Sequence, residues 1–226
     1  MRTTYRKQLD DVLEDLVSLS DIVAVAVRKS TRALLEANIK LAEEVIAGDE
    51  TVDAAKTELE QQLFSLLARQ APVASELRLV VASLRMVSEL ERMGDLAAHV
   101  AKVARLRYPE PAVPAALLPN FTRMGEVAES MVVRAGQTLS QSNVDAAEEL
   151  RRQDEEMDDL RRSQFKVMLG PEWPHGVESA VDVALLGRYY ERISDHAASL
   201  ASRVVYIVTG EFPEDDDWPQ PVGGSS

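Results

Sequence analysis

The sequence predicts an all-α protein built as two tandem, pseudo-symmetric three-helix bundles with six long helices. Three observations support this: a composition rich in helix formers, long proline-free blocks with helical spacing of apolar residues, and an internal repeat. Ala, Leu, Val, Glu and Arg dominate, and aromatic residues make up only 5% of the chain, a balance that favours helices over β-sandwiches. At 226 residues, 46% of them hydrophobic, the chain can fill one large domain or two small ones.

Charge and composition exclude several classes of protein. The lack of cysteine excludes disulfides, thiolate metal sites and thiol nucleophiles. A formal net charge of −13 disfavours direct binding to nucleic acid or to anionic lipid. The N-terminal segment lacks the apolar region of a signal peptide, and no window approaches the roughly 18 uninterrupted apolar residues of a membrane span. We therefore expect a cytoplasmic protein without direct membrane insertion.

Ten prolines divide the chain, because proline disrupts helix interiors. Apolar spacing between them predicts helices at about residues 3–36, 38–70, 73–108, 120–141, 143–169 and 175–210. Asn38 is the predicted cap of the second helix, Gly48 a candidate kink within it, and Ser142 or Asn143 the predicted cap of the fifth. The expected domains are a first bundle at 1–108, a Pro-rich linker at 109–119, a second bundle at 120–210 and a disordered acidic tail at 211–226.

The two halves repeat each other. The segment Glu91-Arg92-Met93-Gly94-Asp95 matches Glu191-Arg192-Ile193-Ser194-Asp195 at an offset of 100 residues. Upstream, Asp49 and Asp53 match Asp154 and Asp158 at an offset of 105 residues, and the loop between the helices absorbs the difference. Two homologous bundles follow from this repeat.

The repeated carboxylates continue an apolar stripe. At about 100° per residue, Glu91 and Asp95 fall below the side chains of Leu77, Val80, Val81 and Leu84. Likewise, Glu191 and Asp195 follow Val177, Ala180, Val181 and Ala184. Carboxylates that replace a core stripe need partners.

Two kinds of partner remain open. Arginines within a turn would form ion pairs; these are Arg85, Arg92, Arg188 and Arg192. Alternatively, a cation would lie between helices, with Asp49 and Asp53 expected to face the helix of Glu91 and Asp95, and Asp154 and Asp158 that of Glu191 and Asp195. Asp49, which follows Gly48, is equally consistent with a capping residue after a kink. All-oxygen ligation suits hard cations such as Mg²⁺, Ca²⁺, Mn²⁺ or Fe³⁺.

Catalytic motifs are lacking, so we expect no enzyme activity. The only Glu-x-x-His, Glu172–His175, lies in a proline-broken loop and is not repeated, which disfavours a ferritin-like di-iron site. His99 is one turn beyond Asp95, but its counterpart is Ser199, so a structural role is favoured over ligation. The chain has no Gly-rich phosphate loop and no nucleophile elbow.

The sequence resembles the PhoU family of phosphate-transport accessory and regulatory proteins. The resemblance is carried by Pro72-x-x-Ser75-Glu76-Leu77-Arg78, by Glu89-Leu90-Glu91-Arg92-Met93-Gly94-Asp95, by Glu191-Arg192-Ile193-Ser194-Asp195 and by Asp49–Asp53, and it covers about residues 5–210. Ser194 departs from the family pattern, which has glycine at that place.

The resemblance implies a function and a ligand set. Family members act between the phosphate ABC transporter and a sensor histidine kinase, repressing the phosphate-starvation response when phosphate is plentiful, and dimers are common. Some bind multinuclear clusters of metals such as Fe, Mn, Mg or Zn through motifs that correspond here to Asp49, Asp53, Glu91, Asp95, Asp154, Asp158, Glu191 and Asp195. Such a protein would sit at the inner face of the membrane through its partners. The alternatives are a metal-dependent enzyme acting on phosphate esters and a metal-binding helical scaffold.

Overall fold

The computed structural model describes residues 2–70, 72–141, 145–171 and 173–211. Six α-helices and one short 3₁₀ helix make up the regular structure of these ranges. They are α1 (Arg2–Leu35), α2 (Ile39–Gln70), α3 (Ser75–Arg107), η1 (Ala115–Leu117), α4 (Leu118–Gln141), α5 (Asp145–Met168) and α6 (Gly176–Thr209).

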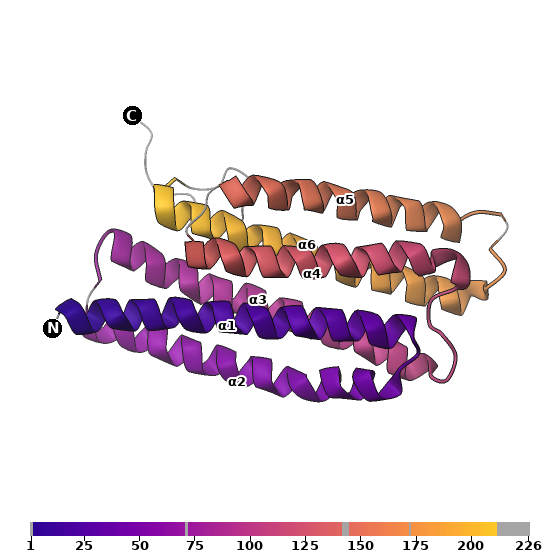
Figure 1. Cartoon of the computed structure of the whole chain (residues 1–226), viewed down its shortest axis with the longest axis horizontal. Helices are drawn as coiled ribbons and strands as arrows, with labels where there is room; N and C mark the ends of the chain where they lie inside the picture. The colour runs from indigo at the N-terminus through magenta and orange to yellow at the C-terminus, as the bar shows by residue number, and fades with distance from the viewer. Residues whose placement is uncertain (1, 71, 142–144, 172, 212–226) are drawn as a thin grey trace.

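The helices form two antiparallel three-helix bundles that lie side by side (Figure 1). Helices α1, α2 and α3 pack on one another, as do α4, α5 and α6, and the bundles meet through α1 against α4 and α3 against α6. Helices α2 and α5 therefore occupy opposite outer flanks. Buried side chains of both bundles join in one hydrophobic core, so the predicted tandem architecture is confirmed.

The connection between α1 and α2 is only three residues long. Asn38 accepts a hydrogen bond of 3.2 Å from the backbone N–H of Leu41 through its Oδ1, which confirms its predicted capping role. At the other end of the fold, Gly210 has a φ of +79° and its N–H donates to the carbonyl of Tyr206. A left-handed glycine at this place ends α6 without steric cost.

The proline-rich connection between the bundles packs into the core. Val113 and Leu117 are each 1% exposed. Helix α4 begins at Leu118 and includes Pro119, so the predicted start at residue 120 was two residues late. Proline is tolerated in a first helical turn because its missing N–H would have no intrahelical partner there. The predicted caps Ser142 and Asn143, and residues 212–226 of the predicted tail, lie outside the described residues.

The predicted core stripes of α3 and α6 were only partly right, because Val80 is fully buried but both stripes begin at exposed residues. Leu77 is 41% exposed and Val177 is 81% exposed, whereas Met86, Leu90 and Ile193 are fully buried. Helices α3 and α6 each pack against three other helices, so the buried arc of each helix is wide and the predicted stripe runs from its core to its outer edge. The carboxylates below these residues therefore lie at the margin of the core rather than within it.

The interface between α3 and α6 shows the pseudo-symmetry directly. Ser199 Oγ of α6 donates a hydrogen bond of 3.1 Å to Glu89 of α3. By the repeat offset of 100 residues, Ser199 corresponds to His99 and Glu89 to Tyr189, and the rings of His99 and Tyr189 lie 5.4 Å apart. The bundles are further joined where Tyr190 Oη lies 2.9 Å from Thr31 Oγ1, a buried hydrogen bond between α6 and α1. Polar contacts thus fix the register in which the two bundles meet.

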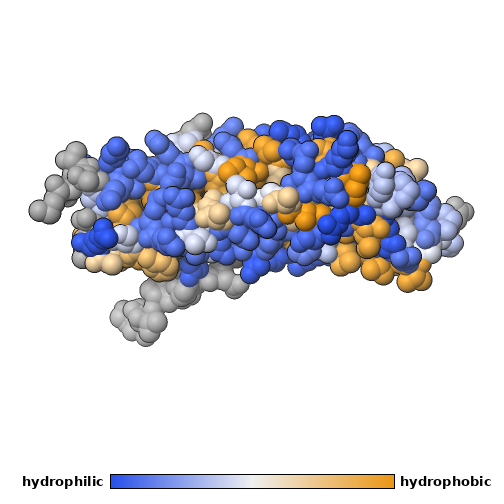
Figure 2. Space-filling model, turned by 90° about the horizontal axis from the view of Figure 1, so that it is seen from below, coloured by the Kyte–Doolittle hydropathy of each residue, from blue (hydrophilic) through white to orange (hydrophobic). Residues whose placement is uncertain are grey.

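The outer surface is largely hydrophilic, with hydrophobic residues exposed in separate clusters on the face shown in Figure 2. None of the helices, over the residues described, combines the length and apolar character needed to cross a membrane.

Candidate metal centre

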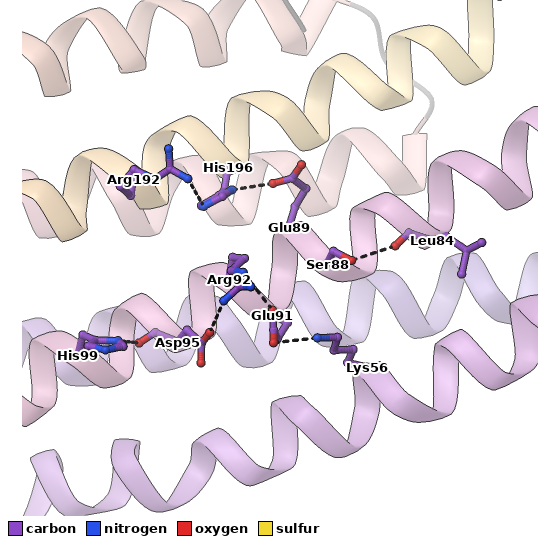
Figure 3. Close-up of polar contacts among 10 residues, drawn as sticks. All are labelled: Lys56, Leu84, Ser88, Glu89, Glu91, Arg92, Asp95, His99, Arg192 and His196. Carbon is purple, nitrogen blue, oxygen red and sulfur yellow. Dashed lines mark hydrogen bonds and ion pairs between the residues drawn. The ribbon is translucent and has the colours of Figure 1, made fainter. Parts of the chain in front are cut away.

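The first carboxylate set lies between α2 and α3. Asp49 and Asp53 project from α2, the former half-buried and the latter exposed. On α3, the side chain of Glu91 is only 12% exposed and accepts a hydrogen bond of 2.8 Å from Lys56 Nζ of α2. Arg92 reaches both Glu91, at 3.7 Å, and Asp95, at 3.2 Å. Figure 3 shows this chain of charges, with Glu91 directed toward Lys56.

The second set repeats the arrangement between α5 and α6. Asp154 is half-buried and Asp158 exposed. Glu191, again with a side chain 12% exposed, forms ion pairs with Arg161 of α5 and with Arg188 of its own helix. Arg192 lies 3.7 Å from Asp195. The glutamate of each set is thus held by cations, as the ion-pair interpretation expects.

The aspartates are less well compensated. Burial, followed by the negative charges of Asp195, Asp158 and Glu191, raises the pKa of Asp154 to about 6. Burial and the charge of Asp95 also raise the pKa of Asp49. A pKa raised by burial and by neighbouring carboxylates means that the ionised form of the aspartate is destabilised where it lies. A bound cation would relieve this repulsion.

The two sets differ in their nearby positive charge. Lys102 and His99 act to lower the pKa of Asp49. Their counterparts in the second repeat, Ser202 and Ser199, carry no charge. The half-buried aspartate of the second set therefore lacks counterparts of the two basic side chains that lower the pKa of Asp49.

Lys56 and Arg161 were missed by sequence reasoning, which considered only arginines next to the glutamates. A signal was available: the two residues are separated by 105 residues, the same offset that relates Asp49 to Asp154 and Asp53 to Asp158. They therefore belong to the same repeated helix face as the aspartates.

The donor chemistry of both sets suits a hard cation, because each offers four carboxylates and no soft ligand. Within the described part of the chain, no three Asp, Glu or His side chains are yet grouped closely enough to hold one ion. Glu91 is held by Lys56 and Glu191 by Arg161, and the aspartates of each set do not form such a group by themselves. Binding would require carboxylates of both helices to turn toward one another.

His99 is occupied by a backbone contact. Its Nδ1 lies 2.7 Å from the carbonyl oxygen of Asp95, so Nδ1 carries the proton and donates. Its ring also contacts that of Tyr189. Both contacts agree with the structural role expected for this histidine.

The serine that replaces the motif glycine is accommodated by packing. A Cβ at Gly94 would come within 3.1 Å of Cγ1 of Val52. The counterpart of Val52 in the second repeat is Met157, and Ser194 and Met157 are both fully buried. An unbranched methionine adapts its shape more readily than valine, which leaves room for a side chain at Ser194.

Comparison with known proteins decides the family. The model of the PhoU domain matches residues 16–104 and again residues 121–204, so one copy covers α1–α3 and the other α4–α6. The chain belongs to the PhoU family. The double match also confirms the tandem repeat within this PhoU-family chain.

Relatives of known name span the whole length. The phosphate-specific transport system accessory protein PhoU homolog 1 of Mycobacterium leprae is 42% identical over 97% of this chain and 99% of its own. PhoU homolog 2 of Mycobacterium tuberculosis is 43% identical over 94% of this chain and 100% of its own. These PhoU proteins are named as accessory proteins and not as enzymes, in agreement with the expectation of no enzyme activity.

Solved PhoU structures share the fold. PhoU from Pseudomonas aeruginosa superposes with a TM-score of 0.84 at 27% identity, covering 92% of this chain and 100% of that one. The phosphate transport system regulatory protein PhoU from Streptococcus pneumoniae gives the same TM-score at 24% identity, over 93% and 99% of the two chains.

Proposed function

We propose that this chain regulates phosphate uptake as the accessory protein of a phosphate-specific transport system. In this role it is an adaptor between a phosphate ABC transporter subunit and a sensor histidine kinase, and it represses the phosphate-starvation response when phosphate is plentiful. The observation that carries the proposal is the 42% identity to a PhoU accessory protein over 97% of the chain.

The architecture suits an adaptor. Six long helices present extended faces, and partner proteins commonly bind helix faces. The shared core and the polar contacts of Tyr190 and Glu89 hold the two bundles in one register, so a partner bound on one bundle is positioned relative to a partner on the other. We propose a cytoplasmic location, at the inner face of the membrane through these partners, and a homodimeric state.

We also propose that the carboxylate sets bind hard metal cations. In the first bundle the ligands are Asp49, Asp53, Glu91 and Asp95; in the second they are Asp154, Asp158, Glu191 and Asp195. The raised pKa of Asp154 supports this, because burial and, after it, the neighbouring carboxylates disfavour its ionised form, which a bound cation would stabilise. A cation at these places would cross-link α2 to α3 and α5 to α6, and so rigidify the surface that a partner meets.

A pull-down from phosphate-replete cells tests the adaptor role. The tagged wild type is compared with E91Q/D95N/E191Q/D195N, and with D10N/E14Q/D21N/E58Q, which removes the same charge from exposed positions. We expect the wild type and the surface control to recover a phosphate-transporter subunit and a sensor kinase, and the first variant to recover less. Failure of the wild type to recover either protein would contradict the adaptor role. Equal recovery by all three would separate that role from the carboxylate sets.

A further inference from the structure

In each carboxylate set, a basic side chain of the neighbouring helix contacts the glutamate. Lys56 of α2 donates to Glu91 of α3, and Arg161 of α5 donates to Glu191 of α6. The exposures agree between the two copies: the cations are each 28% exposed and the glutamates each 12% exposed. Two copies with different cationic residues therefore keep the same contact.

The cation shares a helix face with the aspartates. Lys56 follows Asp53 by three residues, and Arg161 follows Asp158 by three, so in each case the two side chains are neighbours on the helix surface. The basic residue and the aspartate before it thus lie on one side of their helix, and the basic residue contacts the glutamate of the next helix.

An ammonium or guanidinium group and a metal ion compete for the same carboxylate. One oxygen of Glu91 accepts the hydrogen bond from Lys56, and the positive charge of the lysine repels a second cation at short range. Lys56 is only partly buried and has a flexible stem, so it can exchange its contact with Glu91 for water.

We propose that Lys56 and Arg161 are resident counter-cations, which hold Glu91 and Glu191 when no metal is bound and must release them when a metal binds. This inference rests on the proposed metal sites. It assigns to each site a positioning residue that sets its affinity: the stronger the ion pair, the higher the metal concentration at which the glutamate is released. The same exchange would free the basic side chain of Lys56 or Arg161 at the surface beside α2 or α5.

The first site can be tested alone in the full-length chain. A D154N/D158N/D195N background removes ligands of the second site and leaves Glu191 with its arginines. In this background, Mn²⁺ is titrated calorimetrically into metal-stripped protein carrying Lys56, K56M, K56R or K102M. Lys102 is the matched control, because its charge influences Asp49 while the hydrogen bond to Glu91 comes from Lys56.

We expect K56M to bind Mn²⁺ about tenfold more tightly than the parent, K102M to show a smaller gain, and K56R to show none. A gain in K56M no greater than in K102M would reduce Lys56 to a general electrostatic influence and overturn the inference, while leaving the metal site in place. Failure of every variant to bind Mn²⁺ would instead overturn the metal site itself.

Amine labelling gives a second readout that does not depend on affinity. Acetylation of lysines by a water-soluble reagent, followed by mass spectrometry, is compared with and without Mn²⁺ in the wild-type chain. We expect the metal to increase labelling of Lys56 and to leave the labelling of the distant, exposed Lys40 unchanged. Labelling of Lys56 that stays constant at saturating Mn²⁺ would contradict its release.

Discussion

Gly136 in α4 and Ser20 in α1 approach so closely that a Cβ at Gly136 would lie 2.3 Å from Oγ of Ser20. A second such contact lies farther along the same two helices, where a Cβ at Gly125 would lie 2.3 Å from Cγ2 of Thr31. The two contacts are separated by the same number of residues in each helix, as an antiparallel crossing requires. The bundles are therefore joined by two points at which α4 offers no side chain.

We expect Gly136→Ala to lower the free energy of unfolding by about 1–3 kcal/mol, because the added methyl overpacks the contact with Ser20. Gly48→Ala is the matched control within a helix. A Cβ at Gly48 meets nothing within 4 Å, so this change should instead stabilise the chain by about 0.5–1 kcal/mol through helix propensity. Urea denaturation measures both. Equal effects at the two positions would show that the α1–α4 contact relaxes without cost.

Glu89 links the bundles through charge. Its carboxylate accepts hydrogen bonds from His196 Nδ1 at 2.6 Å and from Arg203 Nη2 at 2.8 Å, both on α6, and Figure 3 shows it directed away from the Glu91 set. Burial alone would raise its pKa, but these bonds outweigh burial and lower the pKa to about 2. We expect Glu89→Gln to lower the free energy of unfolding by about 2–4 kcal/mol at pH 7, because it removes the buried negative charge that accepts the hydrogen bonds of Arg203 and His196.

The same bonds set a pH dependence. Because the pKa of Glu89 is lower in the folded chain than its ordinary 4.5, its ionised form stabilises the fold above pH 4.5, and this contribution is lost as the pH falls toward 2. The difference in unfolding free energy between wild type and Glu89→Gln should therefore shrink over that window. A difference that stayed constant from pH 5 to pH 2.5 would assign the effect to packing rather than charge.

The sequence predicts the helices better than their contacts. Prolines and Asn38 mark helix ends by local chemistry, so these were found within a few residues. The carboxylate sets could be proposed from the sequence because the repeat marks their positions. The contacts of Lys56 with Glu91 and of Glu89 with His196 depend instead on which helix faces meet after folding. That choice is set by packing between distant segments, and for the same reason the outer edge of α3 at Leu77 was taken for its core face.

Asp154 gives the opposite pH dependence to Glu89. Its folded-state pKa of about 6 lies above the ordinary 3.8, so its ionisation weakens the fold as the pH rises through that window. We expect Asp154→Asn to stabilise the metal-free chain by about 1 kcal/mol at pH 8, allowing for solvent screening, and to have little effect at pH 4. Asp49→Asn should stabilise less, because Lys102 already offsets part of the repulsion. Denaturation at the two pH values tests this, and a stabilisation by Asp154→Asn as large at pH 4 as at pH 8 would contradict it.

A bound metal ion should offset the destabilisation that these carboxylates cause in the folded chain. A cation that binds only the folded state stabilises it by about 2.7 kcal/mol per site at 100 times its Kd, which for a chain of this size corresponds to a rise in Tm of roughly 5–10 °C. We expect Mn²⁺ to raise the Tm of the wild type, and a chelator to return it to the metal-free value. In E91Q/D95N/E191Q/D195N the shift should be lost, whereas D10N/E14Q/D21N/E58Q should keep it. The comparison between these two variants is the decisive one. With a net charge of −13, weak association of divalent cations with the whole surface is expected. If the two variants respond equally, that general association explains the shift and the carboxylate sets do not.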